Sequence, residues 1–356
     1  MRRFRSSVGQ TAFGMMCGAF VASAFPAYAV TIIPTFENSI TGGASVTGLV
    51  DNNQVEGAID TAIANFESLY SNPGTVGIVF GQSAGTFLGT SDTVDYALSY
   101  SDYTSLLAAD SAANPTNTTL ATAVANLSSS NMPGSGGSVI LTSADARVAL
   151  GVFGATPCFD SAGNYLSSCN GTNDGLITLS SSYAFNYGNT AVAGEYSAVS
   201  TVEHELDEIL GGGGQGSVLN EIAVGDTYFQ NSVGVLDLYR YSAPGTPSFT
   251  TSGSASSYFS VNGGVTDIVG FSQNSNGDFA DFSTCDNIQS AFSCPGLLPA
   301  YTTASPEYQM MQAIGYNTAS SGSAPEPASL SLLGGGLLGF GFALRRKQSS
   351  KKSLRN

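Results

Sequence analysis

Basic side chains are nearly missing from the middle of this 356-residue sequence. Between residues 30 and 324 there is no lysine, and Arg147 and Arg240 stand against 25 acidic residues, which gives this span a formal charge of −23. A surface of this sign repels nucleic acid and anionic lipid and attracts cations or basic partners. The composition therefore excludes nucleic-acid binding.

Histidine is almost as scarce, because His204 is the only one in the chain. Any metal site can therefore use one imidazole at most and must draw its other ligands from oxygen or sulfur. Tryptophan is absent, but 20 phenylalanines and 16 tyrosines remain. A span of about 295 residues with these aromatics is long enough to bury a full core.

The N-terminal segment has the pattern of a secretory signal peptide. Arginines at positions 2, 3 and 5 precede an apolar run over residues 11–25, and Ala27-Tyr28-Ala29 is a small-x-small cleavage signal. An N-terminal membrane anchor is the weaker alternative, because the apolar run is short. We therefore expect residues 1–29 to direct export.

The C-terminal segment combines three features in a fixed order. Pro325-Glu326-Pro327 is followed by an uncharged stretch over residues 328–344, which is just long enough to span a bilayer, and by a basic end that begins with Arg345 and Arg346. This segment resembles the PEP-CTERM sorting signal. The resemblance implies export, anchoring in the inner membrane through the helix, and recognition by an exosortase-type membrane protease. It further implies a final place at the cell surface or outside the cell, often with exopolysaccharide.

The cysteines outside the signal peptide form two close pairs, Cys158 with Cys169 and Cys285 with Cys294. In an exported chain they predict disulfides, most simply two local loops, although four cysteines allow three connectivities. Thiolate metal ligation is the alternative, but neither pair has the C-x-x-C spacing of zinc sites.

Local patterns predict an α+β fold for residues 30–318, with residues 319–324 as a linker to the sorting segment. The expected strands are residues 30–36, 77–81, 138–142 and 175–179, and the expected helices are residues 54–71, 103–109, 118–127, 143–150 and 305–314. After a helix near residue 204, an irregular lobe rich in Gly, Ser and Asn follows, with short strands at residues 258–261 and 265–271.

The segment TVEHELDEILG, residues 201–211, contains the candidate metal-binding and catalytic residues. At 100° per residue, its apolar side chains fall on one side of a helix, whereas His204 and Glu208 lie together on nearly the opposite side, with Glu205 between the two faces. This arrangement suits a metallopeptidase helix with two ligands and a general base. An ordinary amphipathic surface helix shows the same pattern.

The motif resembles that of the zincins, which are secreted H-E-x-x-H metallopeptidases. The resemblance implies a zincin-like sheet-and-helix lobe, a zinc ion on His204, Glu205 as the catalytic base, Gly211 as the turn glycine, and a protein or peptide substrate. This chain departs from the pattern at the second ligand, where Glu208 replaces histidine. Gly214 stands where a third histidine would be.

The further ligand must therefore be a carboxylate, and Asp237, just before Leu238-Tyr239-Arg240, is our candidate. Zinc leads the candidate ions, although a site with one histidine and several carboxylates also suits Mn²⁺, Fe²⁺ or Ca²⁺. We expect Arg240 either to stabilise the oxyanion or to form an ion pair with the helix carboxylates. The stretch over residues 274–281, NSNGDFAD, faintly resembles a structural calcium loop, but the spacing of such a loop is missing.

The leading hypothesis is an exported surface protein with a metallopeptidase-like ectodomain. Its alternatives are a zincin fold without activity and a non-catalytic acidic matrix or adhesion protein associated with exopolysaccharide. The sequence indicates neither the substrate nor the oligomeric state.

Overall fold

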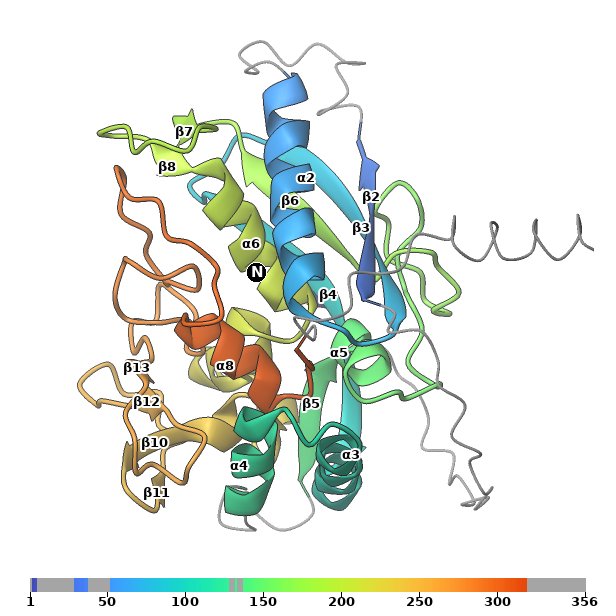
Figure 1. The fold of residues 1–356 in the computed structure, drawn as a ribbon, viewed down its shortest axis with the longest axis vertical. Helices are drawn as coiled ribbons and strands as arrows, with labels where there is room; N and C mark the ends of the chain where they lie inside the picture. Colours follow the sequence, from blue (N-terminus) through green and yellow to red (C-terminus); the bar gives the residue numbers. More distant parts are fainter. Residues whose placement is uncertain (1, 5–28, 38–51, 128–131, 133–136, 319–356) are drawn as a thin grey trace, which may run out of the picture.

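The computed structural model describes residues 2–4, 29–37, 52–127, 132 and 137–318. These ranges fold into mixed helices and sheets, which confirms the α+β prediction (Figure 1). Most of the predicted signal peptide, the linker and the whole sorting segment lie outside them. No helix within the described ranges is long and apolar enough to cross a membrane. The membrane-spanning segment predicted at residues 328–344 lies outside these ranges.

The main sheet has seven strands, in the order β2-β3-β6-β4-β5-β9 with β1 beside β4. Strands β2, β3 and β6 are parallel, whereas β4 runs antiparallel to both β6 and β5. The bounds are β1 (Arg2–Phe4), β2 (Val30–Phe36), β3 (Gly74–Ser83), β4 (Gly89–Ser99), β5 (Ser138–Thr142), β6 (Gly175–Ser180) and β9 (Val233–Gly234).

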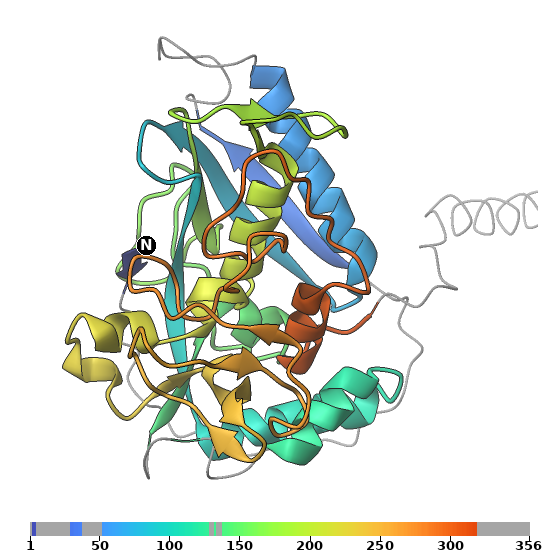
Figure 2. The same ribbon diagram turned by 90° about the vertical axis from the view of Figure 1, so that its left-hand side faces the viewer.

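Two long helices lie side by side against this sheet, α2 (Asn52–Leu69) and α6 (Ala198–Ile209) (Figures 1 and 2). Helix α2 forms because its apolar side chains recur at helical spacing, and Val55, Ile59 and Phe66 from this set are fully buried. The expected helices appear as α3 (Tyr100–Ala113), α4 (Thr118–Asn126), α5 (Ser143–Val148) and α8 (Pro306–Ala313).

The second lobe is irregular, as expected, and is built around a four-stranded sheet in the order β11-β10-β12-β13. Its strands are β10 (Arg240–Ala243), β11 (Thr246–Pro247), β12 (Tyr258–Phe259) and β13 (Val269–Gly270). A two-stranded ribbon, β7 (Phe185–Asn186) and β8 (Tyr196–Ser197), lies beyond the N-terminal end of α6. Short helices follow α6, namely η2 (Gly213–Gly216), α7 (Leu219–Ala223), η3 (Thr227–Phe229) and η4 (Asp237–Tyr239).

Strand β4 was not predicted, although it contacts α6 directly. Its sequence, GTSDTVDYALS, is largely polar, and the polar residues Ser91 and Thr93 are fully buried. The hydroxyl of Ser91 donates to Glu208 on α6. The buried polar side chains of this strand are thus accommodated by hydrogen bonds. Its sequence therefore lacks the alternation of apolar and polar residues that predicts a strand.

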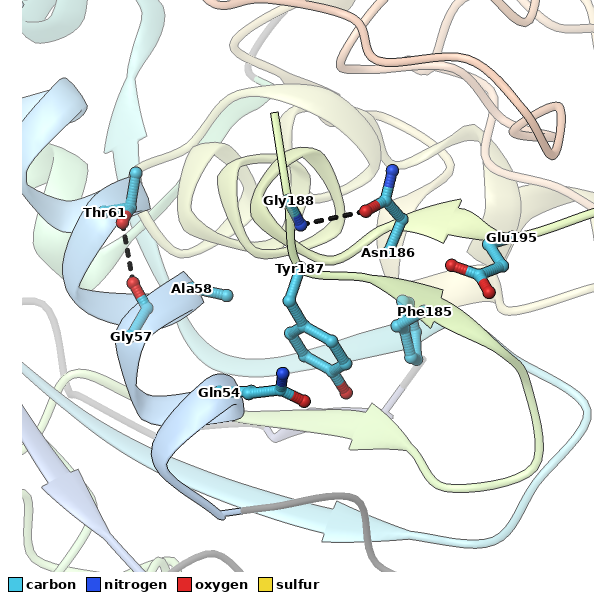
Figure 3. A pocket seen from close by; sticks show the side chains of 9 residues that line it. All are labelled: Gln54, Gly57, Ala58, Thr61, Phe185, Asn186, Tyr187, Gly188 and Glu195. Carbon is cyan, nitrogen blue, oxygen red and sulfur yellow. Dashed lines mark hydrogen bonds between the residues drawn. The ribbon is translucent and has the colours of Figure 1, made fainter. Parts of the chain in front are cut away.

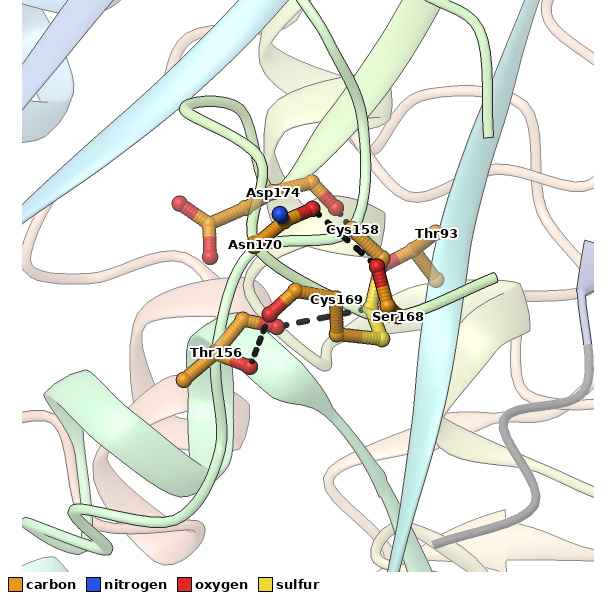
Figure 4. The surroundings of a disulfide bond; sticks show 7 residues. All are labelled: Thr93, Thr156, Cys158, Ser168, Cys169, Asn170 and Asp174. Carbon is orange, nitrogen blue, oxygen red and sulfur yellow. Dashed lines mark hydrogen bonds between the residues drawn. A yellow bond between two sulfur atoms is a disulfide. The ribbon is translucent and has the colours of Figure 1, made fainter. Parts of the chain in front are cut away.

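Both predicted local disulfides are present, Cys158–Cys169 and Cys285–Cys294. The first closes a surface loop beside β4, where the Thr156 hydroxyl also donates to the backbone oxygen of Cys169 at 2.8 Å (Figure 4). The second closes the loop that contacts His204 through Ile288 and Gln289. Only the second disulfide therefore bears on the geometry around the histidine.

Candidate metal centre

Helix α6 is enclosed by protein and is not a surface helix. It starts at Ser197, whose side chain accepts from the amide of Ser200, and it ends at Gly211, whose φ of +94° suits glycine. Val202, Leu206 and Ile209 are fully buried, which stabilises the fold by about 1.5–3 kcal/mol each. Its four carboxyl groups are also buried, at positions 203, 205, 207 and 208. Buried acids need partners, so this burial points to a built polar site.

Three side chains converge at the middle of α6. The Nε2 atom of His204 lies 3.5 Å from Oε1 of Glu208 and 3.7 Å from Oδ2 of Asp281, and one ligand atom of each residue lies within 4.8 Å of the other two. Metal–ligand distances of about 2.0–2.2 Å place neighbouring ligand atoms roughly 3–3.5 Å apart. The two pairs that include His204 are close to this spacing, and the three groups must draw closer together to share one ion.

Hydrogen bonds orient the imidazole and Glu208 for this task. The Nδ1 atom of His204 lies 3.0 Å from the carbonyl oxygen of Ile288 and donates to it in the tautomer that leaves Nε2 as a ligand. Oε2 of Glu208 accepts from the Ser91 hydroxyl at 2.5 Å. Oε1 of Glu208 is buried and faces Nε2 of His204 across 3.5 Å. The two side chains are thus held with these atoms toward each other.

Glu205 lies beside these three residues and is 4 % exposed. Its Oε2 atom has no hydrogen-bond partner in the part of the chain that the structure describes. Strand β4 makes room for it at Gly89, because a Cβ there would come within 2.5 Å of Oε1 of Glu205. The carboxyl group is therefore held close to the candidate ion ligands, with its Oε2 not occupied by a hydrogen bond.

The cluster contains more negative than positive groups, and the pKa values reflect this. Burial raises the pKa of Glu205 well above its usual value, and the charge of Glu208 adds to the effect. Burial also raises the pKa of Asp281 well above its usual value. Burial alone would lower the pKa of His204, but Asp281 and the helix glutamates raise it well above 6.5.

Glu208 is the exception among the carboxyl groups. Burial acts to raise its pKa, but hydrogen bonding to His204 and the positive charge of that residue bring it below its usual value. One imidazole thus faces three carboxyl groups, and burial raises the pKa values of two of them, Glu205 and Asp281, so that they hold protons more readily than usual. A divalent ion would neutralise their charged forms.

The structure places Asp237 away from His204. Its Oδ1 accepts from the Ser217 hydroxyl at 2.6 Å, and its Oδ2 accepts from the amides of Val218 and Gly234. Asp237 therefore fixes backbone turns with both oxygens, and Asp281, not Asp237, is the aspartate that lies beside His204 and Glu208.

Arg240 is likewise not directed at the cluster. Its guanidinium donates to the carbonyl oxygens of Phe279 and Ser272 and to the side chain of Gln273, and it is 1 % exposed. These hydrogen bonds do not include the predicted ion pair with the helix carboxylates. The residue instead holds the segment that leads to Asp281.

Comparisons with known proteins identify the C-terminal segment. Residues 323–347 match the PEP-CTERM protein-sorting motif. The chain carries an exosortase sorting signal. This motif implies export, sorting to the cell surface and processing by an exosortase, a membrane protease. No curated protein and no solved structure matches the chain, so the resemblance to zincins has no support from relatives.

Sequence reasoning missed Asp281, Ser91 and Gln289. Asp281 closes the NSNGDFAD stretch whose oxygen-bearing side chains resembled a weak calcium loop, so a signal was present. Gln289 lies between the cysteines of the second disulfide. Ser91 carried no signal, because serine at a strand position has no characteristic spacing to a metal ligand.

A cavity of about 610 Å³ lies between α2 and the β7–β8 ribbon (Figure 3). Its walls include the aromatic rings of Phe185 and Tyr187 and the carboxylate of Glu195, and no basic side chain lines it. None of its lining residues belongs to the cluster around His204, so the chemistry has to be sought at α6 and not in this cavity.

Proposed function

We propose that this exported, exosortase-sorted protein is a metal-dependent peptide hydrolase. The observation that carries the proposal is the convergence of His204 Nε2, Glu208 Oε1 and Asp281 Oδ2, with Glu205 directly beside them. One nitrogen and several carboxylate oxygens suit Zn²⁺, Mn²⁺ or Fe²⁺. The order along α6 of a ligand, a base and a second ligand one turn later supports peptide hydrolysis, because it resembles the zincin motif.

The ion would supply a Lewis acid that polarises a carbonyl group and acidifies a water molecule. Glu205 would take up a proton from the attacking water and pass it to the leaving amine, and its Oε2 has no hydrogen-bond partner among the described residues. Ile288 holds the imidazole of His204 through Nδ1, and Ser91 holds Glu208. The burial of the cluster keeps bulk water from screening these charges.

Metal content is the first test. We expect the chain, expressed with its own signal and sorting segments and purified after export, to contain one equivalent of transition metal by mass spectrometry. The His204→Ala variant should contain none, and Asp281→Asn should bind at least about tenfold more weakly. Asp286→Asn changes an exposed carboxylate in the same segment and should retain the metal.

Absence of metal from the wild-type protein, even after dialysis against Zn²⁺ and Mn²⁺, would contradict this proposal. The non-catalytic matrix or adhesion protein would then be the better account. Retention of metal by His204→Ala would place the ion elsewhere in the molecule.

The second disulfide gives another prediction. Replacing both Cys285 and Cys294 by serine should weaken metal binding, because this loop presents Ile288 and Gln289 to His204. The matched control replaces Cys158 and Cys169, which close a loop of similar size elsewhere. Each double variant should lose about 2–4 kcal/mol of stability in urea unfolding. Only the variant that lacks Cys285 and Cys294 should also bind metal more weakly in a titration. Equal affinities in the two variants would contradict the assignment.

A further inference from the structure

Gln289 contacts two members of the candidate centre, His204 and Asp281. Its side-chain amide nitrogen lies 3.2 Å from Nε2 of His204 and 2.9 Å from Oδ1 of Asp281. The side chain is fully buried, and the backbone amide of Gln289 donates to Oε1 of Glu307 at 2.9 Å. The residue is therefore fixed at both its main chain and its side chain.

The position of this amide nitrogen is one that a cation would also fill. Both of its neighbours, Nε2 of His204 and Oδ1 of Asp281, act as acceptors in the form of the site that binds metal. The other amide atom, Oε1 of Gln289, is buried and has no hydrogen-bond partner among the described residues. Rotating the amide by 180° exchanges the two atoms and turns this unused oxygen toward the ligands.

The glycine run after α6 makes space for this side chain. Gly213 has a φ of +50°, and a Cβ at this position would lie 1.9 Å from the amide nitrogen of Gln289. No other residue type fits there without displacing the glutamine. The backbone at Gly213 and the loop bearing Gln289 are thus built around a single amide group that faces the cluster.

We propose that Gln289 is a fourth metal ligand, through Oε1, beside His204, Glu208 and Asp281. This inference rests on the proposed metal centre and adds a ligand to it. Four protein ligands fill a tetrahedral site, which leaves no position for water on a four-coordinate ion. Catalysis with four protein ligands therefore needs an ion that takes a fifth or sixth ligand, as Mn²⁺ does readily.

Calorimetric titration with Mn²⁺ tests this ligand. Gln289→Leu should bind Mn²⁺ at least tenfold more weakly than wild type, and Gly213→Ala should show a similar loss because it displaces the same amide. Gln289→Glu keeps an oxygen ligand and should bind at least as tightly as wild type. Gln82→Leu replaces a buried glutamine of β3 and should bind like wild type.

The visible spectrum of the Co²⁺-loaded protein separates a ligand from a packing residue. Loss of a ligand in Gln289→Leu should shift the d–d bands, whereas loss of packing alone should leave them in place at saturating Co²⁺. Unchanged Mn²⁺ affinity and an unchanged spectrum would overturn the fourth ligand while the proposed function stands. Failure of the wild-type protein to bind any ion would overturn both.

Discussion

Replacing Glu205 by glutamine is expected to lower peptide hydrolysis by about 10²- to 10⁴-fold, the usual contribution of a general base. Glutamine has nearly the same size, so it still fits against Gly89 on β4. The three converging ligand atoms belong to other residues, so the variant should retain its metal. The measurement is kcat/KM on a protein substrate such as casein, together with metal content on the same sample.

A matched control is available on the same helix. Glu203 is also buried, and burial raises its pKa to about 7, but its Oε1 accepts from the side chain of Asn65 and it is not part of the cluster. Glu203→Gln should therefore hydrolyse substrate at the wild-type rate. If Glu205→Gln hydrolyses the substrate at the same rate as wild type, Glu205 is not the base.

Glu205→Gln, which should lower activity, should raise the stability of the metal-free protein. Burial raises the pKa of Glu205 in the folded state, so its ionisation opposes folding once the pH exceeds the unfolded value of 4.5. This penalty grows with pH until the folded pKa is passed, and it is absent in acid. Metal-free Glu205→Gln should therefore unfold at higher urea than metal-free wild type at neutral pH, with little difference at pH 4. A site that is costly to fold but active when loaded with metal would show this pattern.

The sequence predicted those parts of the molecule whose signals are local. Helix α6 and its pair of His204 and Glu208 followed from helical spacing alone, since residues four apart are neighbours. The two disulfides followed from close cysteine pairs. Both kinds of inference need no knowledge of how distant segments meet.

The position of Asp281 beside α6 could not be predicted in this way. Asp281 reaches α6 from a segment without regular secondary structure, and no periodicity links the two positions. Asp237 was preferred for its neighbours in sequence, but backbone amides of turns bind carboxylates as readily as a metal does. The enclosure of α6 was also missed, because the irregular loops that cover its polar face carry no hydrophobic pattern.

Arg240→Ala is expected to destabilise the protein by about 3–5 kcal/mol, because it breaks a fully buried hydrogen-bond network and leaves several acceptors without a donor. The guanidinium lies 4.8 Å from the ring centre of Phe271 and donates to two backbone carbonyl oxygens, of Ser272 and Phe279. Removing it leaves these oxygens without their donor in the interior. Urea unfolding followed by circular dichroism measures the loss.

The second arginine of the acidic span provides the control for this prediction. Arg147 pairs with Asp174 and donates to the carbonyl oxygen of Thr75, but its side chain is 24 % exposed, so water can partly replace it. Arg147→Ala leaves the buried carboxylate of Asp174 without its partner and should also cost stability, but it should leave metal affinity unchanged. In Arg240→Ala the affinity should fall as well, because the segment from Ser272 to Phe279 leads directly to Asp281. A loss of stability without any loss of affinity would show that Asp281 keeps its place without this arginine.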